Sequence, residues 1–242
     1  MVATPIGNLR DLSFRALDIL NEVDLILCED TRKSRILFNE FNIMTKYDSL
    51  HEFTSFKNIE KYVSFLEEGN SIALISDAGT PLISDPGFEI VKIAKEKNIF
   101  VNPLPGPSSV ISALVGSGLK IDKFIFEGFP PRKKQELENY LKCYLYEERT
   151  VVLFESPRRI KKLVQSVTEI LGKDRNVTLA KEISKPHQKF ISGSSQSLLN
   201  QIKKDNNLEK GEIVFLIEGT KEKSSIEAVS YTHLRAHETH EN

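Results

Sequence analysis

The chain has 242 residues, 40% of them apolar, with 33 Lys and Arg against 34 Asp and Glu. This length allows one large domain or two small ones, and the apolar fraction excludes a wholly disordered chain. The balanced charge excludes a uniformly basic nucleic-acid binder, so any contact with nucleic acid must depend on local basic patches.

The two cysteines, Cys28 and Cys143, stand far apart and lack the spacing of metal ligands. They are typical of a reduced cytosolic protein, so we expect a cytoplasmic location and no metal site. No apolar run approaches the roughly 20 residues of a membrane helix, and the first residues lack the pattern of a signal peptide.

Predicted strands and helices alternate from the start of the sequence. Residues 2–9 are expected to end a short strand and to form a tight loop. Ser13 is the expected N-cap of the first helix. Residues 24–28 form the next predicted strand, which the polar run 29–33 follows directly, and a later helix is expected to end at Gly69.

Residues 75–87 carry the densest set of functional groups. The apolar run 71–75 predicts a buried strand, and residues 88–97 have the apolar spacing of a helix. Between them stand two aspartates, two glycines, two prolines and three hydroxyl side chains, more than a plain connection needs. Ligands bind at the carboxyl ends of strands in open α/β sheets, so this segment is a predicted binding loop; an elaborate structural turn is the alternative.

A strand over residues 100–104 and a helix capped by Ser108 or Ser109 complete the first half. Four or five strand–loop–helix units in series predict a parallel sheet. After Lys120 the connections shorten and strands pair, which predicts a mixed sheet. Its strands are expected over residues 124–128, 150–154, 177–182, 189–193 and 212–217, with helices ending near Glu148 and Leu171 and another near residues 198–202.

The predicted fold is therefore α/β with two domains. Residues 1–106 form the N-terminal domain, residues 107–120 the boundary or linking helix, and residues 121–219 the C-terminal domain. Residues 220–242 fit neither pattern. Three histidines there, His233, His237 and His240, would share one face of a helix as metal ligands can, but a disordered or non-native tail is the preferred interpretation.

Each polar cluster follows a predicted strand, and parallel strands in register would bring these clusters to one rim. The clusters are residues 4–8, 29–33, 77–85, 105–109, 127–134 and 155–159. Their glycines, prolines and short hydroxyl side chains let the backbone approach a ligand such as a folded adenosine with an amino-acid group. The absence of G-x-G-x-x-G after a strand and of G-x-x-x-x-G-K-[ST] argues against Rossmann dinucleotide and P-loop enzymes.

Three basic clusters lie beside these loops. They are Arg32-Lys33-Arg35, Arg132-Lys133-Lys134 and Arg158-Arg159-Lys161-Lys162. Grouped on one rim they would bind phosphates despite the small net charge. A solvated helix start is the alternative for each cluster alone.

Six ordered motifs resemble the ribosomal RNA small-subunit methyltransferase I family of the tetrapyrrole methylase superfamily. They are residues 2–9, 29–32, 76–87, 103–109, 126–129 and 154–158, and the resemblance extends from Val2 to about Gly219. It implies S-adenosylmethionine as methyl donor and 2′-O-methylation of a decoding-centre cytidine in the 16S rRNA of the small ribosomal subunit. It also implies a homodimer of chains with two α/β domains and the cofactor in the cleft between them.

The same resemblance assigns roles to residues. Those expected to bind the cofactor are Pro5, Ile6, Gly7, Asn8, Asp77, Ala78, Gly79, Thr80, Ile83, Ser84, Asp85, Ser108, Ser109, Glu127, Gly128 and Ala180. A ribose hydroxyl is a poor nucleophile that needs a base or a nearby cation, for which Asp30, Glu155 and Lys181 remain open candidates. Those expected to bind RNA phosphate are Arg32, Lys33, Arg132, Lys133 and Arg158.

Two other functions remain open at this point. A methyltransferase with a tetrapyrrole acceptor would keep the fold and the donor, although the basic clusters argue against it. A non-catalytic RNA-binding assembly factor would have lost the use of the cofactor site, although the intact sequence of residues 77–80 argues against that.

Overall fold

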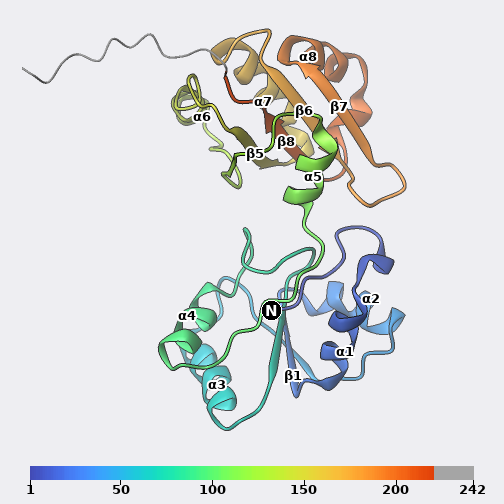
Figure 1. The fold of residues 1–242 in the computed structure, drawn as a ribbon, viewed down its shortest axis with the longest axis vertical. Coiled ribbons are helices and arrows are strands. Elements are labelled where there is room, and N and C mark those ends of the chain that lie inside the picture. The colour runs from blue at the N-terminus through green and yellow to red at the C-terminus, as the bar shows by residue number, and fades with distance from the viewer. Residues whose placement is uncertain (221–242) are drawn as a thin grey trace, which may run out of the picture.

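A computed structural model describes residues 1–220, whose strands fall into two separate sheets. Figure 1 shows one sheet with its helices in the lower, N-terminal half and the other in the upper, C-terminal half. The α/β fold class, with one parallel and one mixed sheet, is confirmed. The domain boundaries stay predictions, and the predicted tail with its three histidines lies outside the described residues from position 221 onward.

The N-terminal half is built on a parallel sheet in the order β2-β1-β3. Its strands are β1 (Leu25–Cys28), β2 (Tyr47–Ser49) and β3 (Ile72–Ile75). Its helices are η1 (Leu9–Asp11), α1 (Phe14–Glu22), α2 (Thr31–Glu40), α3 (Phe56–Glu67) and α4 (Phe88–Glu96). In β1 and β3 every residue after the first is buried, as expected of strands covered on both faces.

The register of this sheet places the carboxyl ends of its three strands side by side. Cys28 at the end of β1 pairs with Ser49 at the end of β2 and with Ile75 at the end of β3. The loops that follow the three strands therefore leave the sheet on one rim, as the sequence predicts.

Three predictions for this half were wrong. The strand expected to end within residues 2–9 does not form, since Thr4 makes only an isolated bridge with Gly79. The expected strand over residues 100–104 does not form. Leu104 N donates to Met1 O (2.9 Å), and Val2 N donates to Leu74 O (2.9 Å). These isolated hydrogen bonds do not extend into a β-ladder. Conversely, β2 was not predicted. It has three residues, two of them exposed, so it lacks the apolar pattern that marks a strand.

Ser13 caps α1 as predicted, because its Oγ accepts a hydrogen bond from Ala16 N at 3.1 Å. We expect Ser13→Ala to lower the free energy of unfolding by about 1 kcal/mol, measured by urea denaturation. The matched control is Ser64→Ala, at an exposed position inside α3, which should change stability by less than about 0.5 kcal/mol. Equal losses in the two variants would contradict a capping role.

The C-terminal half is built on a sheet in the order β4-β5-β8-β6-β7. Its strands are β4 (Phe124–Phe126), β5 (Thr150–Glu155), β6 (Asn176–Lys181), β7 (Lys189–Ser194) and β8 (Ile213–Ile217). Its helices are α5 (Ser109–Ser117), α6 (Lys134–Lys142), α7 (Pro157–Ile170), α8 (Ser195–Lys204) and η2 (Asn206–Glu209). The helix expected to reach Glu148 ends at Lys142.

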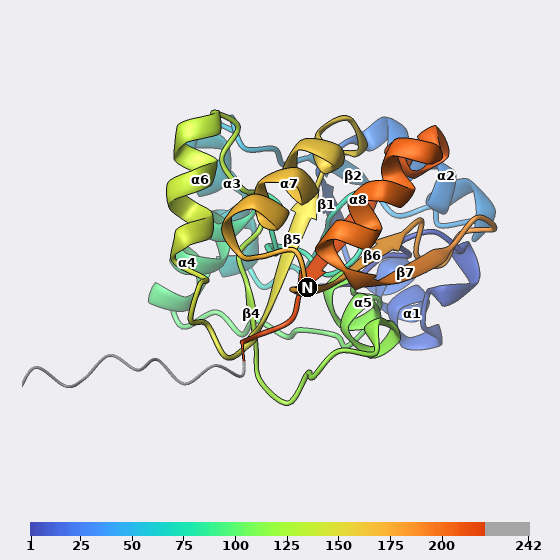
Figure 2. The same ribbon diagram turned by 90° about the horizontal axis from the view of Figure 1, so that it is seen from above.

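Two apolar clusters cover opposite faces of this sheet. Leu153, Leu179 and Phe215 pack with α6, α7 and α8 on one face. Val152 and Val214, which alternate with them along the strands, pack with α5 on the other. Figure 2 shows α6, α7 and α8 together over the upper sheet, with the N-terminal half beneath. The chain thus passes from one half to the other just before α5. No helix within residues 1–220 has the length and apolar character to cross a membrane.

Candidate active site

A cleft of about 400 Å³ is lined by segments from both halves. The N-terminal half contributes Ile6 and residues 78–80 and 83–85, and the start of α5 contributes residues 108–110. The C-terminal half contributes the ends of β5 and β6 and the start of β8. Loops far apart in the sequence therefore meet around one cavity of a size that suits a small ligand.

The predicted cofactor residues divide into two groups. Those lining the cleft are Ile6, Ala78, Gly79, Thr80, Ile83, Ser84, Asp85, Ser108, Ser109 and Ala180. Those that do not line it are Pro5, Gly7, Asn8, Asp77, Glu127 and Gly128.

Several of the second group support the lining residues. A Cβ on Gly128 would lie 3.4 Å from Ser84 Oγ, and a Cβ on Gly7 would lie 2.9 Å from Ile183 O. Asn8 N donates to Ser184 Oγ at 3.3 Å. The contacts of Gly7 and Asn8 place the loop at residues 5–8 against the segment that connects β6 and β7.

The loop after β3 is fixed from both sides. Thr4 and Gly79 exchange two backbone hydrogen bonds of 2.9 Å, and Thr80 Oγ1 donates to Pro107 O at 3.1 Å. Within the loop, Leu82 (φ 74°) and Ser84 (φ 67°) adopt the left-handed conformation that non-glycine residues rarely take. Such strain persists only where neighbouring contacts over-determine the backbone, and it is concentrated at functional sites.

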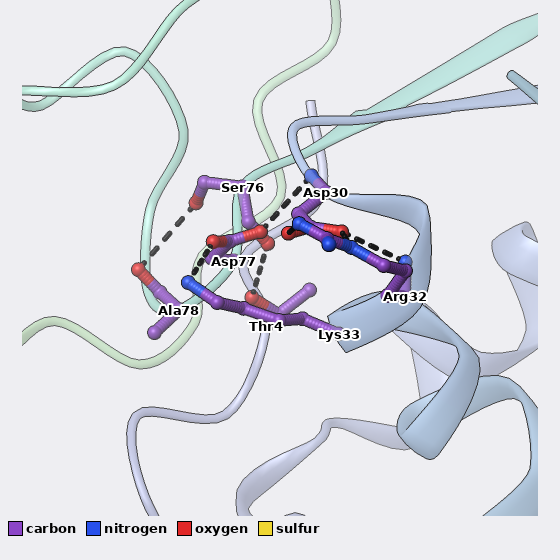
Figure 3. A network of polar contacts seen from close by, with 7 residues as sticks. All are labelled: Thr4, Asp30, Arg32, Lys33, Ser76, Asp77 and Ala78. Carbon is purple, nitrogen blue, oxygen red and sulfur yellow. Dashed lines mark hydrogen bonds and ion pairs between the residues drawn. The ribbon is translucent and has the colours of Figure 1, made fainter. Parts of the chain in front are cut away.

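Asp77 binds the neighbouring loop instead of facing the cleft. Its Oδ1 accepts from Asp30 N (3.1 Å) and its Oδ2 accepts from Lys33 Nζ (2.5 Å), as Figure 3 shows. The Asp30 carboxylate caps α2 through Arg32 N and is held bidentately by the Arg32 guanidinium, at 3.0 and 2.7 Å. These contacts connect the rims of β1 and β3.

The three candidates for the catalytic group have different surroundings. Only Glu155 lines the cleft. Hydrogen bonds from Arg32 hold the pKa of the Asp30 carboxyl well below its usual range, which makes this group a poor base. Lys181 is buried at the end of β6, in register with Ile213, and is absent from the cleft lining.

Glu155 is 4% exposed at the end of β5. Its Oε1 accepts from Ser156 N at 2.7 Å. Arg159 Nη2 lies 3.2 Å from Oε2 as an ion pair, but no hydrogen bond is aligned with this oxygen. Burial raises the pKa of the Glu155 carboxyl, and the Ser156 N–H and the Arg159 charge oppose this effect.

The predicted RNA-binding cations stand where helices begin, after the carboxyl ends of strands. Arg32 and Lys33 are 86% and 65% exposed at the start of α2, and Lys133 is 81% exposed before α6. Each of these three pairs with a carboxylate, from Asp30, Asp77 and Glu136 respectively. Arg132 and Arg158 are also exposed.

Comparisons with known proteins agree with this geometry. The model of the family described as Tetrapyrrole (Corrin/Porphyrin) Methylases matches residues 1–199. Ribosomal RNA small subunit methyltransferase I of Escherichia coli O157:H7 is 42% identical over 221 residues, which are 91% of this chain and 77% of that protein. The chain belongs to the ribosomal RNA small subunit methyltransferase I family. It is therefore a methyltransferase.

Another member of the methyltransferase I family, from Thermotoga maritima, is 43% identical over 90% of this chain and 97% of its own. Among solved structures, diphthine synthase matches with a TM-score of 0.70 at 15% identity, over 90% of this chain and 88% of that one. A cobalt precorrin-4 methyltransferase matches with a TM-score of 0.64 at 16% identity, over 90% and 92%. At such identities the likeness shows the fold alone.

Sequence reasoning missed several lining residues of this methyltransferase I family member. Phe129, Phe154, Ser156 and Pro157 line the cleft and lie within the motifs at residues 126–129 and 154–158, but the sequence pattern gives none of them a role. Residues 211–214 also line the cleft, but no sequence pattern marks them as part of a site. They reach it because β8 runs antiparallel to β5 and β6, which places the first residues of β8 beside the last residues of those two strands. A search confined to the carboxyl ends of strands overlooks such a segment.

Proposed function

We propose that this chain transfers a methyl group from S-adenosylmethionine to the ribose 2′-oxygen of a decoding-centre cytidine in the 16S rRNA of the small ribosomal subunit. The observation that carries the proposal is a cleft that both halves line, with the buried Glu155 carboxylate in its wall. A homodimer in the cytoplasm is part of the same proposal. The names of the relatives support a substrate in the ribosomal RNA of the small subunit.

The cleft suits this donor. Gly79 lines the cleft, and a Cβ at this position would crowd Ile6 Cγ2 at 3.2 Å, so a larger residue would disturb the cleft wall. Phe129, Phe154 and Val214 offer apolar walls, and Ser108 and Ser109 offer hydroxyl and backbone groups where α5 begins. When bound, S-adenosylmethionine supplies a methyl group that its sulfonium has already activated.

The chain's own residues then align the acceptor and accept its proton. Alignment of donor and acceptor supplies a large part of such a rate enhancement. Glu155 would take the proton that the 2′-hydroxyl loses when that oxygen receives the methyl group that S-adenosylmethionine would supply. A carboxylate whose pKa is raised by burial is a stronger base than an exposed one, which favours Glu155 over Asp30 in this role.

The test is mass mapping of 16S rRNA after incubation of small subunits with the protein and labelled donor. We expect one methyl group on the ribose of a decoding-centre cytidine. A methyl group on a base, or transfer to a precorrin and none to the small subunit, would refute the assigned reaction.

Arg32 and Arg158 lie on opposite halves, and the proposal places both on the RNA. We expect Arg32→Ala and Arg158→Ala each to weaken binding to small subunits and to lower the slope of log K against log salt by about one. Filter binding across a salt series measures both effects. Arg15→Ala, an exposed position on α1 outside the basic clusters, should match the wild type. An unchanged slope in either test variant would remove that residue from the RNA contact.

A further inference from the structure

A second cavity, of about 450 Å³, opens on the same rim of the N-terminal sheet. It is lined by Glu29 after β1, by residues 50–52 and Thr54 after β2, by Ile59 on α3 and by residues 84–90, which lead into α4. Ser84 and Asp85 line both this cavity and the proposed donor cleft. A molecule in the second cavity therefore touches the same short segment as the donor.

The walls of the second cavity combine apolar and carboxylate surfaces. Leu50, Ile59 and Ile90 are buried in its floor. Four acidic residues line it, Glu29, Glu52, Asp85 and Glu89. Burial and then the charge of Glu29 raise the pKa of Asp85 to about 6.

Hydrogen bonds fix the turn at residues 51–54, which borders the second cavity. His51 N donates to Thr54 Oγ1 at 2.9 Å, and Phe53 N donates to His51 Nδ1 at 3.2 Å. The rings of His51 and Phe53 lie 6.5 Å apart between centroids, and Phe53 is exposed. Phe53 itself does not line the cavity, so these contacts fix the turn that carries the lining residues His51 and Thr54.

We infer that this cavity receives the base of the nucleotide to be methylated, and that Glu29 accepts a hydrogen bond from the exocyclic amino group of that base. The inference rests on the proposed function and names its specificity-determining residue. A base that enters the cavity brings its own ribose to the segment at residues 84–85, which borders the donor cleft. Enzymes that modify a nucleotide commonly read it after it has been turned out of its stack.

Charge decides which end of the nucleotide enters. Carboxylates repel phosphate, whereas they accept hydrogen bonds from the amino group of cytosine. The nearest predicted phosphate ligands, Arg32 and Lys33, follow Glu29 in the sequence and are mostly exposed. The base therefore enters the acidic cavity while the phosphates stay with the cations outside.

The test compares methylation of small subunits reconstituted with either cytidine or uridine at the acceptor position. We expect the wild type to prefer cytidine by about tenfold in initial rate, because uridine offers a carbonyl where cytidine offers an amino group. Glu29→Gln should reduce this preference to about twofold, since an amide donates as well as accepts. Glu22→Gln, at the exposed end of α1, is the matched control and should keep the wild-type preference.

Donor binding, measured by calorimetry, distinguishes failure of this inference from failure of the proposed function. Glu29 does not line the donor cleft, so Glu29→Gln should bind S-adenosylmethionine like the wild type, which also shows that it is folded. If Glu29→Gln retains the tenfold preference, the inference is overturned and the proposed function stands. If the wild type transfers no methyl group to either subunit, the proposed function fails and the inference fails with it.

Discussion

Glu155→Gln is expected to lower the rate of methyl transfer by about a hundredfold while donor affinity stays within about twofold. Glutamine keeps the shape of the side chain and its hydrogen bond from Ser156 N, but it cannot take the proton of a 2′-hydroxyl. Single-turnover methylation of small subunits measures the rate, and calorimetry measures donor binding.

The pH profile of Glu155→Gln distinguishes a base from a structural residue. Burial raises the Glu155 pKa, so the wild-type carboxylate becomes protonated, and the rate falls, as the pH drops through that raised value. Glu155→Gln should lose this acidic limb. Glu96→Gln, at an exposed position on α4, should keep both the rate and the limb. A variant at position 155 with an unchanged profile would remove Glu155 from proton transfer.

Gly79→Ala is expected to weaken donor binding at least tenfold and to lower the free energy of unfolding by about 1–2 kcal/mol. Gly79 has φ 85°, where an L side chain is strained. The added methyl group would also crowd Ile6 Cγ2 at 3.2 Å in the wall of the cleft. Calorimetry with S-adenosylmethionine and urea denaturation measure the two effects.

Gly69 is a matched control for Gly79. It has φ 91° at the end of α3, and an added Cβ there would meet nothing within 4 Å. Gly69→Ala should therefore lose a similar amount of stability with unchanged donor affinity. If both variants lose donor affinity equally, backbone strain alone explains the result and Gly79 has no special place in the cleft.

The parts of the fold that depend on neighbouring residues were readable from the sequence. The apolar run at residues 71–75 forms β3, Ser13 and Ser108 cap their helices, and Gly69 ends α3 with a positive φ. In each case the signal and the structure lie within one or two turns of chain.

The parts that depend on distant pairing were not readable. β2 is a strand only because β1 lies beside it, and residues 100–104 have the composition of a strand without a ladder to join. The antiparallel direction of β8 brings residues 211–214 to the site, and no local pattern gives the direction of a strand.

The candidate site also combines features that the sequence predicts with features that depend on contacts between distant residues. The sequence predicted that the loops of both halves converge, because that follows from strand order and polar composition. It could not separate Asp30 from Glu155 as a base. The Arg32 guanidinium occupies the Asp30 carboxylate, whereas Glu155 Oε2 is left without an aligned hydrogen bond, and only the folded chain shows these contacts.

A ligand that contacts both halves of the chain also changes how the protein unfolds. The backbone crosses from one half to the other just before α5, and the cleft wall draws on both sides of that crossing. We expect a donor bound in the proposed cleft to stabilise both halves together, because neither half could then unfold without releasing it. At a donor concentration one hundred times Kd, this stabilisation amounts to about 2.7 kcal/mol. Amide hydrogen exchange would then slow in both halves together.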